Sequence, residues 1–117
     1  MIPIHIVISN HRDAPPVSTQ PSVQICAWRI FETQHGQLLA GFLENGSTCR
    51  LTSPIETVNI PGREVRTHSG RRYELIGAPA TDLLRLAVMA AQLKIASASN
   101  ATDITDAVWV KMCAATA

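Results

Sequence analysis

The sequence predicts an α+β protein, in which a strongly curved antiparallel sheet or small β-barrel is followed by two C-terminal α-helices. Up to residue 79, short alternating segments are separated by turn signals about every 8 to 12 residues, which is typical of a meander or barrel. After Pro79 the pattern changes to helix-forming residues. The 117 residues, 46% hydrophobic and 16% charged, favour a single domain, 1–117, mainly β over 1–79 and helical over 80–117.

The first strand is expected at the N-terminus, where isoleucine occupies every second position from Ile2 to Ile8. Pro3 places this strand at a sheet edge or at its own start, because proline cannot donate to the ladder. Residues 9–22 include three prolines and several small polar residues, which predicts a loop. This loop is the best candidate for a mobile segment or one that a partner orders.

Four more strands are expected before residue 61. A turn signal at His35-Gly36 separates the first of these strands from the second. Asn45-Gly46, the strongest short-range hairpin signal, separates the second from the third. Pro54 interrupts the pattern before the last strand. The expected strands are 23–33, 38–43, 48–52 and 55–60.

Residues 62–77, GREVRTHSGRRYELIG, predict an arginine-rich β-hairpin with its tip at Ser69-Gly70. Four of the ten Lys and Arg residues lie there. The arginine side chain donates two parallel hydrogen bonds to a carboxylate or phosphate, so the hairpin is the candidate site for a macromolecular partner. The alternative is that these arginines only keep an exposed strand edge soluble. The candidate macromolecule-binding residues are Arg63, Arg66, His68, Arg71, Arg72 and Tyr73.

Two registers of this hairpin can be argued. A three-residue loop of 69–71 sets Arg66 opposite Glu74, a favourable pair of opposite charges. A loop of 68–70 sets Arg66 opposite Arg72, an unfavourable like-charge pair, but puts glycine at the third loop position, where this turn usually needs it. We favour the first register because of its charge pairing.

Residues 82–96, DLLRLAVMAAQLKIA, predict the first helix, with Thr81 as its cap and Asp82 in its first turn. Its polar stripe is narrow, so we expect burial on more than one side, against the second helix and a homodimer partner. The second helix is expected over 103–114, capped by Thr102 or Asp103, although its centre, Val-Trp-Val, would also suit a strand. The candidate interface residues are Leu84, Val88 and Trp109.

Composition and motifs argue against several functional classes. The net charge of +1 is too low for a general nucleic-acid coat. Cysteine and histidine are dispersed without metal-ligand spacing, so we expect no metal and no cofactor. No nucleophile elbow, phosphate-binding loop or dinucleotide fingerprint is present, and we expect no enzymatic activity. We also expect a cytoplasmic location and no membrane partner, because no apolar run approaches the ~20 residues of a membrane span.

The stretch 41–79 contains RLTSPIETV, REVRTHSG and RRYELIGAP. It resembles small uncharacterised proteins of bacterial phage, plasmid and genomic-island origin, which share a pattern like R-T-S-x-[IV] followed by V-x-T-x-S-G-x-x-Y-x-L. The resemblance covers about a third of the chain and leaves out the predicted helices. It implies a bacterial accessory protein and a host- or defence-directed inhibitor, and it implies no site residue.

Three functional hypotheses follow. The leading one is a non-enzymatic accessory or mobile-element protein that binds another macromolecule, most simply a protein, to inhibit or modulate it. The second is a small nucleic-acid-binding regulator that uses the hairpin of residues 62–77. The third is an unrecognised hydrolase or a small-ligand-binding protein.

Overall fold

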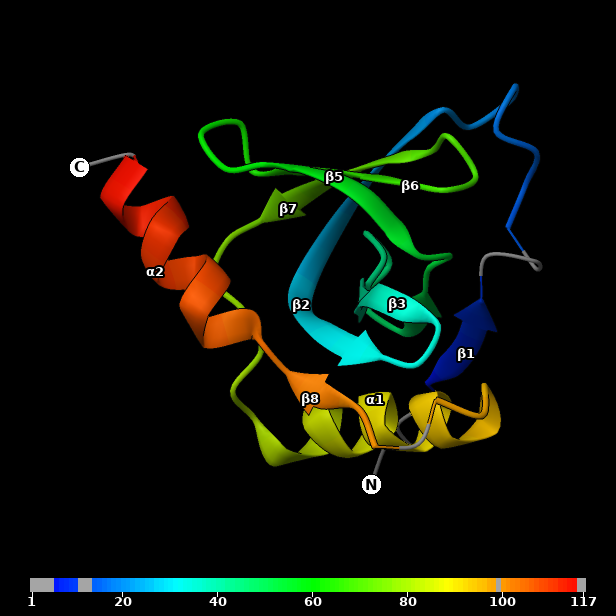
Figure 1. Cartoon of the computed structure of the whole chain (residues 1–117). Coiled ribbons are helices and arrows are strands. Elements are labelled where there is room, and N and C mark those ends of the chain that lie inside the picture. The colour runs from blue at the N-terminus through cyan, green and yellow to red at the C-terminus, as the bar shows by residue number, and fades with distance from the viewer. Residues whose placement is uncertain (1–5, 11–13, 99, 116–117) are drawn as a thin grey trace.

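The computed structural model describes residues 6–10, 14–98 and 100–115, and it shows a curved sheet accompanied by two helices (Figure 1). The α+β fold class with two C-terminal helices is therefore confirmed. The strands are β1 (Val7–Asn10), β2 (Ser22–Thr33), β3 (Gly36–Phe42), β4 (Thr48–Leu51), β5 (Ile55–Asn59), β6 (Glu64–Thr67), β7 (Arg72–Ile76) and β8 (Thr102–Asp103). The helices are α1 (Leu83–Ile95) and α2 (Thr105–Ala115).

The strands are ordered β1-β4-β3-β2-β7-β6-β5, and β8 pairs with β2 outside this path. This order corrects two expectations. The sheet is mixed and not antiparallel throughout, because β1 runs parallel to β4 and β2 runs parallel to β7. It is also open and not a closed barrel, with β1 at one end of the path and β5 at the other. Both parallel pairs join segments far apart in sequence, which turn signals cannot reveal.

The local hairpin signals are confirmed. Asn45-Gly46 joins the antiparallel strands β3 and β4, and Ser69-Gly70 joins the antiparallel strands β6 and β7. The expected first strand is shown only in part: β1 continues to Asn10, whereas residues 2–5 lie outside the described part of the chain.

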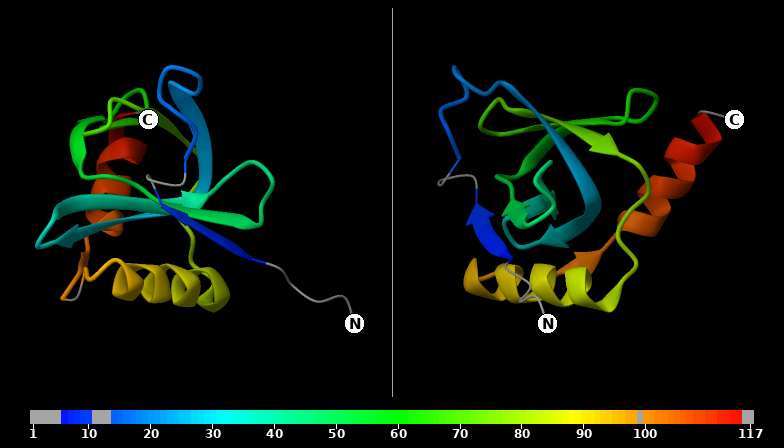
Figure 2. Two further views of the ribbon diagram at one scale, coloured as in Figure 1. Left: turned by 90° about the vertical axis from the view of Figure 1, so that its right-hand side faces the viewer. Right: turned by 180° about the vertical axis from the view of Figure 1, so that it is seen from behind.

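A bend in β2 gives the sheet its curvature (Figure 2). Its first half pairs with β7, its second half pairs mainly with β3, and the register shifts between Cys26 and Arg29. Ala27 lies at this bulge with a φ of 46°, in the left-handed region. A Cβ atom on Gly41 of β3 would lie 2.7 Å from Ile25 Cγ1, so glycine allows the bent strand to pass close to β3.

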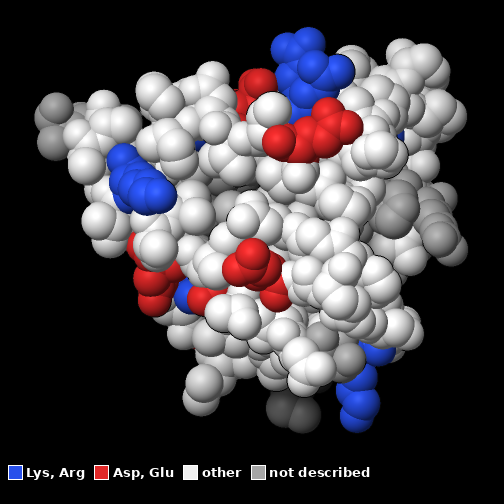
Figure 3. Space-filling view, in the orientation of Figure 1, with Lys and Arg blue, Asp and Glu red and all other residues white. Residues whose placement is uncertain are grey.

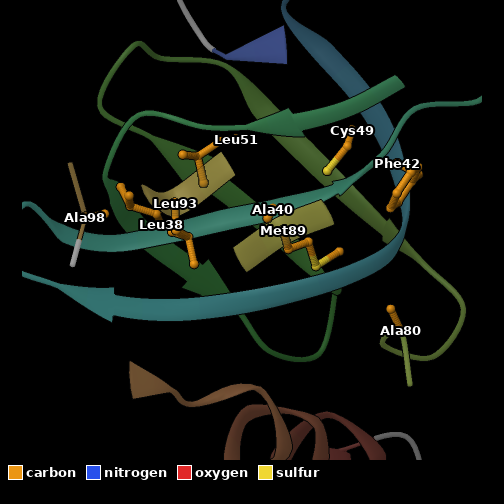
Figure 4. Close-up of a cluster of buried hydrophobic side chains, with 9 residues drawn as sticks. All are labelled: Leu38, Ala40, Phe42, Cys49, Leu51, Ala80, Met89, Leu93 and Ala98. Atoms are coloured by element: carbon orange, nitrogen blue, oxygen red, sulfur yellow. The ribbon is translucent and has the colours of Figure 1, made fainter. Parts of the chain in front are cut away.

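Alternate side chains of β3 supply two separate cores. Leu38, Ala40 and Phe42 point toward α1, where they meet Met89 and Leu93 (Figure 4). Leu39 lies on the opposite face and belongs to the second core. The other buried members of the second core are Ile25, Trp28, Ile30, Val65, Tyr73, Leu75 and Met112.

The two helices cover different parts of the sheet, which corrects the expectation that α1 is buried against the second helix. α1 packs on the first core with only Met89, Gln92 and Leu93 buried, and Met112 of α2 packs in the second. Figures 1 and 2 show the helices apart from each other. No helix in the described part of the chain is long and apolar enough to cross a membrane.

The helix starts differ slightly from those expected. Asp82, and not Thr81, caps α1: its side chain accepts a hydrogen bond from the Arg85 backbone N–H at 3.0 Å. Thr102 and Asp103, the two residues expected to cap the second helix, form β8 beside β2, and α2 begins at Thr105. Asp103 still accepts a hydrogen bond from the Thr105 N–H at 2.9 Å, as a capping side chain does.

Candidate functional site

The arginine-rich segment forms the β6–β7 hairpin, but in the register that we did not favour. Arg66 lies opposite Arg72, and the loop is residues 68–70. The Thr67 N–H donates to the Arg71 carbonyl at 3.0 Å, and the N–H of Gly70, whose φ is 90°, donates to the Thr67 carbonyl at 2.9 Å. The turn's need for a left-handed third residue therefore outweighs the cross-strand charge pairing of exposed side chains.

This register buries two of the six candidate binding residues. Arg71 is 2% exposed and Tyr73 is 1% exposed, whereas we expected both on the cationic surface. The Arg71 guanidinium donates to the Gln20 carbonyl at 2.9 Å and to the Pro15 carbonyl. It therefore anchors the segment that precedes β2. Tyr73 is a core residue and takes no part in an exposed contact surface.

Two other candidates already have neighbours within the chain. The Arg63 guanidinium carbon lies 5.0 Å from the centre of the Trp109 ring, in cation–π geometry. His68 is exposed at the hairpin tip, and its Nδ1 lies 3.3 Å from Glu56 Oε1. The exposed arginines that remain on the hairpin strands are Arg66 and Arg72.

The outer face of β5, β6, β7 and β2 carries two charged rows. In one row the strand register sets Arg66 beside Arg72, and the uncharged side chains of Thr57 and Ser22 flank them. The next row consists of Asn59, Glu64, Glu74 and Gln24. We name the two together the two-row surface. Figure 3 shows basic side chains at the top of the molecule, where Figure 1 places β5–β7, directly beside acidic ones.

Both rows contain a like-charge pair, because Glu64 lies opposite Glu74 just as Arg66 lies opposite Arg72. One short-range contact partly relieves the acidic row: Gln24 Nε2 donates to Glu74 Oε2 at 3.4 Å. Directly opposed like charges destabilise a strand pair by roughly 0.2–1 kcal/mol. The surface is therefore arranged less favourably for folding than alternating charges would be.

The three candidate interface residues do not form one surface. Leu84 is exposed on α1, and Val88 is partly buried against the first core. Trp109 of α2 packs against the second core, where its ring meets Trp28 edge to face at 5.9 Å between centroids. Trp109 is thus an internal anchor and Leu84 is the only one of the three that is exposed.

Sequence reasoning missed a buried ion-pair group. Arg29 of β2 is 9% exposed and lies 3.0 Å from Asp103 and 3.3 Å from Asp106. Burial opposes ionisation of Asp103, but hydrogen bonds with Thr105 and Arg29 outweigh it and hold the pKa of this carboxyl below its ordinary value. The group joins β2, β8 and α2. Arg29 is more than 70 residues from both aspartates, so no local pattern marks the group.

The exposed apolar face of α1 includes Leu84, as expected for an interface residue, but not Val88. The residues on this face are Leu83, Leu84, Ala87, Ala90, Ala91 and Ile95, with Lys94 as the basic residue among them. The narrow polar stripe correctly predicted that most of the helix surface is apolar. That stripe does not predict which apolar side of the helix packs on the sheet.

The described residues contain no group of three His, Cys, Asp or Glu side chains placed to hold a metal ion. Burial raises the pKa of the Cys49 thiol to about 12, against a smaller lowering by the Gly41 backbone, so this cysteine is a poor nucleophile. Comparisons with protein-family models, with curated proteins and with solved structures found no match.

Proposed function

We propose that the protein is a non-enzymatic accessory protein that binds another protein through the two-row surface and inhibits or modulates it. The observation that carries this proposal is the pairing of like charges in both rows. Within each row the two like charges, Arg66 with Arg72 and Glu64 with Glu74, lie directly opposite each other and repel across the strands. A partner protein with an acidic and a basic row in the complementary order would compensate both pairs on binding.

The two-row surface suits a protein better than a nucleic acid. Residues two apart along a strand are separated by about 7 Å, which is within the Debye length at physiological salt. A phosphate backbone attracted to Arg66 and Arg72 would therefore also lie within range of the carboxylates of Glu64 and Glu74. A nucleic-acid surface gains affinity from several uncompensated cations, because each neutralised phosphate releases counterions.

The test compares two matched charge reversals. The variant Arg66→Glu/Arg72→Glu reverses the basic row, and Glu64→Arg/Glu74→Arg reverses the acidic row. A partner is first captured from bacterial lysate, with and without nuclease, and its affinity for the two variants is then measured. We expect a protein partner to lose affinity for both variants. If the acidic-row variant instead binds single- or double-stranded DNA more tightly while the basic-row variant releases it, the nucleic-acid regulator is supported and our proposal is wrong.

The proposal also includes a homodimer formed by the exposed face of α1. The occupant is a second copy of the chain in antiparallel orientation, which brings Lys94 of one helix toward Asp82 of the other, where Asp82 also pairs with Arg85 at 3.3 Å. Asp82 caps the N-terminal end and Lys94 lies in the last turn, so each would approach the other in the second copy. The alanines between them permit the close approach of two helices.

The cellular setting is proposed on the sequence alone. The resemblance of residues 41–79 to phage, plasmid and genomic-island proteins supports a bacterial accessory gene and an inhibitory role. Cys26 and Cys49 form no disulfide, at an intermediate and a buried position respectively. Free thiols of this kind are compatible with the cytoplasm, which we propose as the compartment.

A further inference from the structure

An open surface cavity of about 540 Å³ lies between β1, β4 and the C-terminal end of α1, and Ile8 and Ile95 on its walls are 45% and 73% exposed. Its apolar walls come from three elements that are distant in sequence, with Ile8 on β1, Leu51 on β4 and Ile95 on α1. A volume of this size is within the range of small-molecule sites, which are mostly apolar with a few fixed polar groups. The residues that line it are not part of the two-row surface, so the inference below is independent of the proposed function.

One wall of the cavity is held rigidly by Gln92, which is 2% exposed. Its Nε2 donates to the Cys49 carbonyl at 3.2 Å and to the Ser9 carbonyl, and its Oε1 accepts from Cys49 Sγ at 3.1 Å. These bonds tie α1 to β1 and β4 around the cavity. Because the amide is fully engaged, Gln92 shapes the site and offers little to a ligand.

The described lining contains no Asp, Glu, Lys or Arg. His35 at the rim has its Nε2 3.3 Å from the Ser97 carbonyl, where the imidazole is placed to donate. Ile95, Ala96 and Ser97 bring the C-terminal end of α1, which carries partial negative charge, to the cavity. The Leu93 and Lys94 carbonyls there accept from the backbone N–H groups of Ala98 and Ser97, and the Ser97 carbonyl also accepts from Gln34 Nε2. A charged group entering this site would lose its hydration without gaining an ion pair, and an anion would also be repelled by the helix end.

We propose that this cavity binds a small, uncharged and mainly apolar molecule. The apolar walls receive the body of the ligand, and the C-terminal end of α1 disfavours an anion. The same arrangement discriminates against carboxylates, sulfonates and phosphates.

The experiment uses two fluorescent dyes with one skeleton. N-phenyl-1-naphthylamine is uncharged and has one N–H donor, whereas 8-anilino-1-naphthalenesulfonate adds a sulfonate. We expect saturable, single-site binding of the uncharged dye, and binding of the sulfonated dye weaker by about tenfold or more. Equal affinity for both dyes, or no binding of the uncharged dye, would overturn the proposal.

Two tryptophan variants locate the bound dye. Ala96→Trp fills the mouth of the cavity and should abolish binding of the uncharged dye, while Ala107→Trp adds the same side chain at an exposed position of α2 and should leave binding unchanged. NMR spectra of the unmodified protein supply a second readout that does not depend on the variants folding. We expect the dye to shift the methyl signals of Leu38, Leu51 and Ile95. Shifts confined to residues outside the cavity would overturn the assignment of the site.

Discussion

Replacing Arg71 by methionine should destabilise the protein far more than the same change at its neighbour Arg72. The Arg71 guanidinium is buried and donates to the carbonyls of Gln20 and Pro15, so the variant loses two hydrogen bonds from a charged donor. Such bonds contribute about 1.5–3 kcal/mol each. Both carbonyls lie in a surface segment where water can replace part of the loss. We therefore expect the free energy of unfolding to fall by about 3 kcal/mol.

The measurement is a urea titration of the unmodified protein, Arg71→Met and Arg72→Met under identical conditions. Arg72 is exposed, so its replacement should change stability by less than about 0.5 kcal/mol. Hydrogen exchange of residues 14–21 supplies a local readout, because release of the anchor should speed exchange there. If the two variants unfold at the same urea concentration and exchange alike, Arg71 does not anchor this segment and our reasoning is wrong.

Three further predictions concern cysteine reactivity, acid stability and assembly. At pH 8 a thiol reagent should label the exposed Cys113 and spare the buried Cys49 in the folded protein. The pKa of Cys49 rises from 9.0 to about 12 on folding, so its stabilising contribution should be present below pH 9 and be lost toward pH 12. In Cys49→Ala the free energy of unfolding should therefore depend less on pH between 9 and 12. Because folding lowers the pKa of Asp103, this carboxylate stabilises the fold above the ordinary carboxyl pKa, and the stabilisation is lost as the pH falls through the pKa of the folded state. Asp103→Asn should therefore be less stable at pH 7 and less sensitive to acid. Thermal unfolding at several pH values measures both effects. Sedimentation should show a dimer that Ala91→Glu converts to a monomer; a monomeric unmodified protein at high concentration would remove the proposed interface.

The parts of the fold that follow from neighbouring residues could be predicted. Asn45-Gly46 and Ser69-Gly70 mark hairpins because Gly46 and Gly70 occupy left-handed turn positions, which glycine adopts without strain whatever surrounds it. The first helix was placed to within a residue at each end, since helix formers and a capping aspartate act locally.

The parallel strand pairs, the open sheet and the separation of the helices could not be predicted. They depend on contacts such as Ser22 with Arg72, which join distant segments and leave no periodic trace. The hairpin register failed for a different reason: we weighed the Arg66–Glu74 charge pair above the geometry of the loop. That error also placed Arg71 in the exposed loop. Correcting it shows that the candidate site is a surface of paired rows and not a cationic patch.

The bent strand β2 has a consequence for synthesis on the ribosome. β2 emerges early, yet the Ile30 N–H donates to the hydroxyl of Thr105, which is translated 75 residues later. Its neighbour β3 follows directly, whereas β7 and β8 follow well after it. The nascent chain therefore cannot complete the sheet around β2 until Thr105 has left the exit tunnel. Pairings so distant in sequence slow folding, and they leave the apolar side chains of β2 open to chaperones meanwhile.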